Sequence, residues 1–185
     1  MTGVAPRLVV TGLDAEERAV FLRDEEPEPV TARALPGQEM YLLWGSPDGG
    51  ATVGGANPEP IVLPFFAGVG GSRLLLVRFP PDASVQPPVG DPEQLAAETT
   101  ERLPGLMDWF EPGDRMHTTD TLDYGICLEG ELWLELGDGK EVRLTPGTCV
   151  VQQGTRHAWY NRGDVPALMC FVGIGAERVG AERVG

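Results

Sequence analysis

Glycine and proline interrupt this chain throughout its length. The 185 residues include 25 glycines and 17 prolines, which are spread along the sequence rather than clustered. Both residues disfavour helix interiors, because glycine loses much backbone entropy there and proline lacks the amide donor. The chain is therefore expected to form many short strands joined by turns, with little room for long helices.

Short segments of apolar character lie between these turn residues. We expect strands at residues 7–11, 18–23, 30–34, 39–44 and 73–79, and then at 124–129, 131–136, 141–145, 148–152, 158–161 and 167–173. The sequence Gly137-Asp138-Gly139 predicts a hairpin loop between two of them. Many short strands with turns at this spacing predict an all-β barrel or sandwich.

One helix is expected, over Pro92–Leu103. Asp91 is positioned to cap it, Pro92 occupies its first turn, and Leu95, Ala96, Thr99 and Leu103 lie along one side. We expect one domain, because residues 1–80 contain too few strongly apolar strands to bury a core alone. We expect residues 1–80 to supply strands and a loop that extend the barrel, with the surface loop at 45–72. A linker with the helix (81–112), a core (113–176) and a flexible tail (177–185) should follow.

The formal net charge of −14 narrows the choice of partners. It argues against nucleic acid and anionic membranes, because both attract basic surfaces. No apolar run is long enough to span a bilayer, and the first residues do not resemble a secretion signal. Cys127, Cys149 and Cys170 are odd in number and lie in apolar segments, so we expect buried thiols in a reducing cytoplasm.

The chain contains only two histidines, His117 and His157. Because side chains alternate along a strand, an extended segment from residue 117 to residue 123 places His117 and Asp123 on one face. If both segments turn inward, His117, Asp123 and His157 supply two imidazoles and a carboxylate to one divalent metal, Fe, Mn, Ni or Zn. Asp120 is the competing carboxylate, since a bulge would reverse the alternation. The alternative to metal binding is that the two histidines have no shared role and that Asp123 is a structural carboxylate.

The same alternation selects further candidates. Thr119 and Thr121 share the face of His117, and Trp159 shares that of His157, so we expect all three to border a substrate pocket. Gln152 is a further candidate, because a glycine-containing turn separates it from His157. Asp120 is the nearest candidate for a catalytic base apart from the metal. Packing roles in the core or wall are the alternative for these side chains.

Residues 110–174 resemble the cupin superfamily. In its first motif, Gly-x5-His-x-His-x3–4-Glu-x6-Gly, His117 matches the first histidine and Thr119 replaces the second. Asp123 takes the place of the glutamate, with six residues between it and Gly130. In its second motif, Gly-x5-Pro-x-Gly-x2-His-x3-Asn, the first spacing is one residue short. There Gly147, Gly154, His157 and Asn161 match, and Gln152 replaces the proline. The segment is similar to single-domain bacterial and fungal cupins with a His-x-Thr-x-Thr-x-Asp-Tyr segment, several of which belong to biosynthetic clusters.

This resemblance implies a double-stranded β-helix, or jelly roll, that commonly forms a homodimer. It also implies a metal-dependent enzyme acting on an oxygen-rich small molecule, such as a polyketide-like metabolite or an aromatic acid. Cyclisation, decarboxylation, isomerisation and dioxygenation are all compatible with such a site, because the reaction depends on the pocket and the metal more than on the motif. The alternative is a small-molecule binding protein without catalysis, which the replacement of the second histidine by Thr119 favours.

Overall fold

The described residues form ten strands, one α-helix and two short 3₁₀ helices. A computed structural model of the chain describes residues 5–54 and 59–180. The strands are β1 (Leu8–Leu13), β2 (Ala19–Glu25), β3 (Glu39–Ser46), β4 (Ser72–Phe79), β5 (Thr121–Glu129), β6 (Leu132–Leu136), β7 (Glu141–Leu144), β8 (Cys149–Gln153), β9 (His157–Tyr160) and β10 (Ala167–Gly175). The helix α1 spans Pro92–Arg102, and short 3₁₀ helices cover Asp82–Ser84 and Met107–Trp109.

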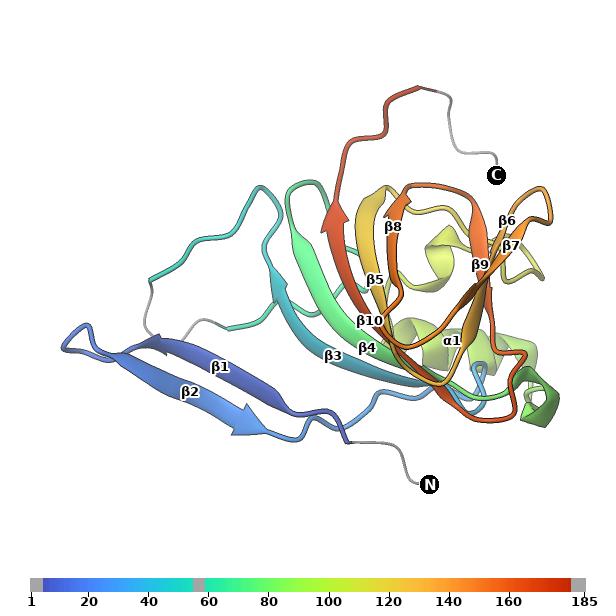
Figure 1. Cartoon of the computed structure of the whole chain (residues 1–185), viewed down its shortest axis with the longest axis horizontal. Coiled ribbons are helices and arrows are strands. Elements are labelled where there is room, and N and C mark those ends of the chain that lie inside the picture. Colours follow the sequence, from blue (N-terminus) through green and yellow to red (C-terminus); the bar gives the residue numbers. More distant parts are fainter. Residues whose placement is uncertain (1–4, 55–58, 181–185) are drawn as a thin grey trace.

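Two antiparallel sheets form the body of the molecule. The larger has the strand order β3-β4-β10-β5-β8 and the smaller the order β7-β6-β9. The larger sheet curves, and the smaller sheet stands opposite its β5–β8 side (Figure 1). Apolar side chains of the two sheets pack together, with Leu132 and Leu134 of β6 against Cys127 of β5 and Met169 of β10. The predicted all-β jelly roll is confirmed.

The first half of the chain contributes in two ways. Strands β3 and β4 continue the larger sheet, with β4 paired to β10. Strands β1 and β2 form a separate hairpin, which lies to one side of the body (Figure 1, blue). Its Leu8 packs against the cluster that contains Tyr41 and Leu43 of β3. The strand predicted at residues 30–34 is wrong: Val30 alone pairs with Met40, and the chain then turns, with the Leu35 amide bonded to the Ala32 carbonyl.

Helix α1 begins as predicted and ends one residue earlier. The Asp91 side chain accepts hydrogen bonds from the amides of Glu93 and Gln94, and thereby satisfies donors that a helix start leaves free. Leu95, Thr99 and Leu103 are buried, whereas Ala96 is exposed. Leu103 packs into the cluster of Met40 and Phe65, so the end of the helix is anchored beside the larger sheet.

Several surface features also bear on the predictions. Cys149 is exposed because it lies on the outer face of β8, in alternation with the exposed Val151 and Gln153, so the expectation of three buried thiols is wrong at this position. Within the described ranges, no helix is long and apolar enough to cross a membrane. In the segment predicted to be a flexible tail, Arg178 bonds Asp120 (Nε–Oδ1, 2.5 Å) and the carbonyls of Thr119 and Gly154, while residues 181–185 lie outside the described residues.

Candidate functional site

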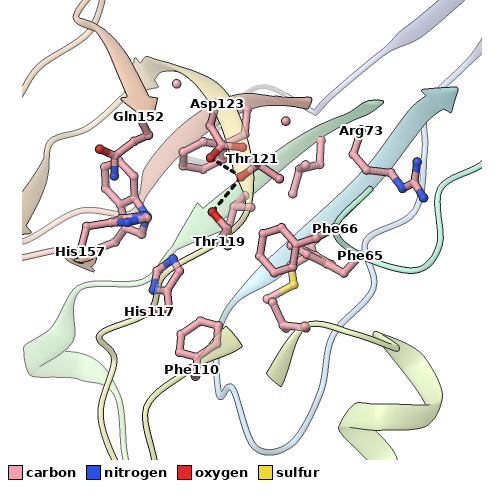
Figure 2. A pocket seen from close by; sticks show the side chains of 18 of the residues that line it. Phe65, Phe66, Arg73, Phe110, His117, Thr119, Thr121, Asp123, Gln152 and His157 are labelled. Carbon is pink, nitrogen blue, oxygen red and sulfur yellow. Dashed lines mark hydrogen bonds between the residues drawn. The ribbon is translucent and has the colours of Figure 1, made fainter. Parts of the chain in front are cut away.

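His117 and His157 lie directly opposite each other. They form an antiparallel bridge in which the amide of each residue bonds the carbonyl of the other, at 2.9 and 3.0 Å. Two residues that exchange both backbone bonds carry their side chains on the same face. The ring centroids are accordingly 4.1 Å apart (Figure 2). The backbone therefore brings together the only two imidazoles of the chain, which are 40 residues apart in sequence.

The protonation of both rings is set by their surroundings. The Nδ1 atom of His117 lies 3.0 Å from the Arg115 carbonyl, and that of His157 lies 2.8 Å from the Thr155 carbonyl. A carbonyl only accepts, so each Nδ1 carries the proton and each Nε2 retains its lone pair. Burial lowers the pKa of His117, and burial together with repulsion from His117 lowers the pKa of His157 to about 3. Both rings are therefore neutral at neutral pH.

Asp123 enters the same cavity from β5. Its Oδ2 accepts a hydrogen bond from Thr121 Oγ1 at 2.7 Å, and Thr121 Oγ1 lies 2.7 Å from Thr119 Oγ1 (Figure 2, dashed lines). A hydroxyl carries one proton, so when Thr121 donates to Asp123 it accepts from Thr119. Burial raises the pKa of Asp123 to about 6, and the two hydroxyl groups oppose that rise. The alternation predicted for this strand is present, since His117, Thr119, Thr121 and Asp123 all line the cavity.

Gln152 and Trp159 complete the polar end of the cavity. Gln152 lies opposite Asp123 in the β5–β8 register and is 6% exposed. Its Oε1 accepts from Thr155 Oγ1 at 2.9 Å. Trp159 packs edge-on against His157 and Phe171, with centroid distances of 5.3 and 5.4 Å. All four residues predicted to border a pocket (Thr119, Thr121, Gln152 and Trp159) do line it.

The rest of the cavity is apolar. Its volume is about 120 Å³. Its wall includes side chains from the β3 and β4 strands, from β10, and from two loops: Met40, Phe65, Phe66, Leu75, Val77, Leu106, Phe110 and Phe171. Phe110 stacks on His117 with the ring centroids 4.4 Å apart. The site therefore combines a small polar end with a large aromatic and aliphatic body, which is typical of small-molecule pockets.

Several of these residues were not predicted from the sequence. Phe65 and Phe66 lie in the stretch expected to be a surface loop, yet Phe65 is buried in the core. Arg73 is also buried, and its guanidinium donates to the carbonyls of Pro64, Ser46 and Ser72. It lies at the other end of the cavity from the histidines and points away from them (Figure 2). Arg73 shares its alternation with Leu75 and Val77, a pattern that could have indicated burial.

The structure does not bring Asp120 to this cavity. Its carboxylate is bonded to Arg178 and borders a separate hollow formed with Gly154 and Val179. Thr119 and Thr121 on either side of it face the histidines, so strand alternation directs Asp120 to the opposite face. The geometry gives no support to a catalytic base at this position.

The fit to a metal ion differs between the proposed ligands. The two imidazoles offer unprotonated Nε2 atoms, which are good ligands for a transition metal. Asp123 instead has its carboxylate bonded to Thr121, and Thr119 occupies the position of the second motif histidine. Among residues 5–54 and 59–180, no group of three His, Cys, Asp or Glu residues is arranged to hold a metal ion. The structure therefore forms the histidine pair without the predicted three-ligand cluster.

Comparison with known proteins agrees with the fold and with the position of the histidines. A family model described as "Cupin domain" matches residues 109–173, the segment that carries both histidines and Asp123. Residues 109–173, about a third of the chain, therefore match the cupin family. The resemblance inferred from the two motifs is thus confirmed.

The curated relatives include proteins from fungi. The chain is 40% identical over 65 residues to phomopsin biosynthesis cluster protein C' of Diaporthe leptostromiformis, which is 35% of this chain and 34% of that protein. It is 25% identical over 167 residues to the cupin-domain-containing oxidoreductase srdB of Neurospora crassa, covering 90% of this chain and 71% of the relative. Among solved structures, KdgF from Halomonas sp. is similar, with 16% identity, a TM-score of 0.40, and coverage of 75% and 81%. The first of these matches spans about a third of the relative's length.

Proposed function

We propose that this chain is a biosynthetic cupin enzyme whose reaction on a small molecule takes place at the His117–His157 pair. One observation carries the proposal: two neutral imidazoles, fixed by their own backbone bridge, face a cavity lined mainly by apolar side chains. Apolar surroundings strengthen the polar contacts made inside such a cavity. The relatives named for biosynthesis clusters and as oxidoreductases support the same class of protein.

The shape of the site indicates what kind of substrate it takes. Phe65, Phe66, Phe110 and Phe171 suit a flat, largely apolar body, and the histidine end suits an oxygen-bearing head group. This agrees with a polyketide-like or aromatic metabolite. Cyclisation, decarboxylation, isomerisation and dioxygenation each act on such a head group. The homodimer and the cytoplasmic location remain predictions.

We propose that a divalent metal, Fe, Mn, Ni or Zn, is the cofactor, and that His117 and His157 bind it. Their Nδ1–H bonds to backbone carbonyls orient both rings and leave each Nε2 available. A bound ion would supply Lewis-acid or oxygen-activating chemistry to the substrate head group. Asp123 is the proposed third protein ligand: the bond from Thr121 to its Oδ2 would orient the carboxylate and leaves Oδ1 available.

Metal analysis of protein purified without an affinity tag tests this proposal. We expect near-stoichiometric metal in the wild type and its loss in both His117→Ala and His157→Ala. Asp120→Asn is the matched control, because Asp120 lies outside the cavity, and it should retain the metal. Metal retained by both alanine variants would contradict the assignment of the histidines.

A second function is favoured by one specific feature. Thr119 stands where the motif has a histidine, and its buried hydroxyl belongs to the Thr121–Asp123 network rather than to a ligand cluster. A site with fewer metal ligands suits a small-molecule binding protein without catalysis. Metal-free, fully folded wild type that binds small aromatic molecules would support this second function over the enzyme.

A further inference from the structure

The side-chain amide nitrogen of Gln152 is buried and has no hydrogen-bond partner. Within the described parts of the chain, its Nε2 is the only buried side-chain nitrogen or oxygen without a hydrogen-bond partner. Its Oε1 is engaged by Thr155, so the amide is held with Nε2 free. A buried donor without a partner destabilises the fold. Because Gln152 lines the cavity, a bound molecule can supply the missing acceptor.

Asp123 presents an acceptor next to this donor. The two residues are direct neighbours across β5 and β8, and both side chains enter the cavity (Figure 2). Neighbouring side chains on one face of a sheet have their Cβ atoms roughly 5 Å apart. Oδ2 of Asp123 is bonded to Thr121, whereas Oδ1 faces the space left by Gly173. A Cβ atom on Gly173 would lie 2.8 Å from that oxygen, so glycine keeps the space open.

We propose that Gln152 and Asp123 together recognise a neutral head group in which a carbonyl adjoins an N–H or O–H group, as in a lactam or an enolised hydroxy-ketone. The carbonyl accepts from Gln152 Nε2, and the adjacent N–H or O–H donates to Asp123. A carboxylate in the same place would have no proton for Asp123 and would meet a second negative charge. This inference rests on the proposed function, since it names the substrate class of the same cavity.

Binding of simple bicyclic probes tests the recognition in chelator-treated protein. The probes are 2-quinolone, its N-methyl derivative, 2-naphthoate and naphthalene. Their binding is measured by NMR from the side-chain amide signals of Gln152. We expect 2-quinolone to shift these signals and to bind most tightly of the four. N-methylation, which removes the donor to Asp123, should weaken binding about tenfold, as should Gln152→Leu.

The matched control is Gln153→Leu. Gln153 is the next residue of the same strand, is exposed, and does not line the cavity, so its loss should leave binding unchanged. Gln152→Glu is a second variant in case the leucine protein does not fold, and it should also weaken 2-quinolone because it replaces the donor with an acceptor. Equal binding of 2-quinolone by wild type and either Gln152 variant would overturn the proposal, as would tighter binding of 2-naphthoate.

The same titrations separate this inference from the proposed function. If naphthalene binds as well as 2-quinolone, the cavity accepts small molecules and only the assignment of the head group fails. If none of the probes binds, the small-molecule site fails together with the inference. A further titration compares the binding of 3-hydroxychromone with that of chromone, which lacks the hydroxyl group. Together with the 2-quinolone pair, it distinguishes an O–H head group from an N–H head group.

Discussion

Asp123→Asn should make the free protein more stable at neutral pH, although it removes a charged residue from the candidate site. Asp123 is buried, and this burial raises its pKa from 3.8 to about 6. The two threonine hydroxyls favour the charged form and do not offset the burial. The ionised carboxylate is therefore a source of instability in the unliganded fold, and a neutral amide of similar size removes it.

The magnitude follows from the shift in pKa. The folded pKa lies above the unfolded value, so the contribution of this group to the free energy of unfolding is greatest below pH 3.8 and is lost as the pH rises through 6. Each pKa unit corresponds to about 1.36 kcal/mol. The shift of about two units gives Asp123→Asn a stabilisation of up to about 3 kcal/mol at pH 7 and above, and almost none near pH 4.

Urea unfolding of wild type and Asp123→Asn at about pH 4 and about pH 7.5, both with a chelator present, measures the difference. The two histidines titrate in both proteins, so their contribution cancels when the variants are compared at one pH. Asp120→Asn is the control: it weakens the ion pair with Arg178 and should cost at most about 1 kcal/mol. Two results would contradict this reasoning: Asp123→Asn is less stable than wild type at pH 7.5, or its stability exceeds that of wild type by the same amount at both pH values. Either result would mean that burial does not raise the pKa of this carboxyl.

Three further outcomes are expected. Because the folded pKa of His157 is about 3, below its usual 6.5, this residue alone should remove up to about 5 kcal/mol of unfolding free energy as the pH falls from 6.5 to 3. His157→Gln should therefore lose less stability than wild type over this range in the same urea titration. Gly173→Ala should destabilise the protein by about 1–3 kcal/mol, because the new methyl group meets Asp123 Oδ1. In a double-mutant cycle, Gly173→Ala should cost much less stability when Asp123 is already alanine. Arg178→Ala should cost about 1–3 kcal/mol in thermal or urea unfolding, since it removes bonds to Asp120, Thr119 and Gly154; no change would mean that this residue does not anchor the strand end.

Local patterns were sufficient to predict the strands and the inward face. The alternation from His117 to Asp123 depends only on an extended backbone, and the structure places all four alternate residues in the cavity. The helix start was also predictable, because the Asp91 cap and Pro92 act within one turn. The prediction of a strand at residues 30–34 was wrong. The apolar residues of this segment form a turn that packs against β3, and they do not pair as a strand.

Features that depend on distant contacts could not be predicted in the same way. The sequence gives no register between residue 117 and residue 157, although their direct bridge is what brings the imidazoles together. The burial of Phe65 depends on a loop that folds back against Met40 and Leu106. An aromatic pair, Phe65-Phe66, in a stretch rich in Gly and Pro was the available signal, since large aromatic side chains are seldom left in solvent.

Two hydroxyl groups determine the hydrogen bonds of the Asp123 carboxylate. A motif match fixes which residues share a face, but it does not decide which neighbour each side chain bonds. Thr121 is two residues from Asp123 on the same face, and its hydroxyl bonds the carboxylate at 2.7 Å. With threonine rather than histidine at position 119, the hydroxyl of Thr119 joins this network, which runs from Asp123 through Thr121 to Thr119 (Figure 2). The chemistry of this cavity therefore divides between a histidine pair and an Asp123–Gln152 pair, and the two can be tested separately.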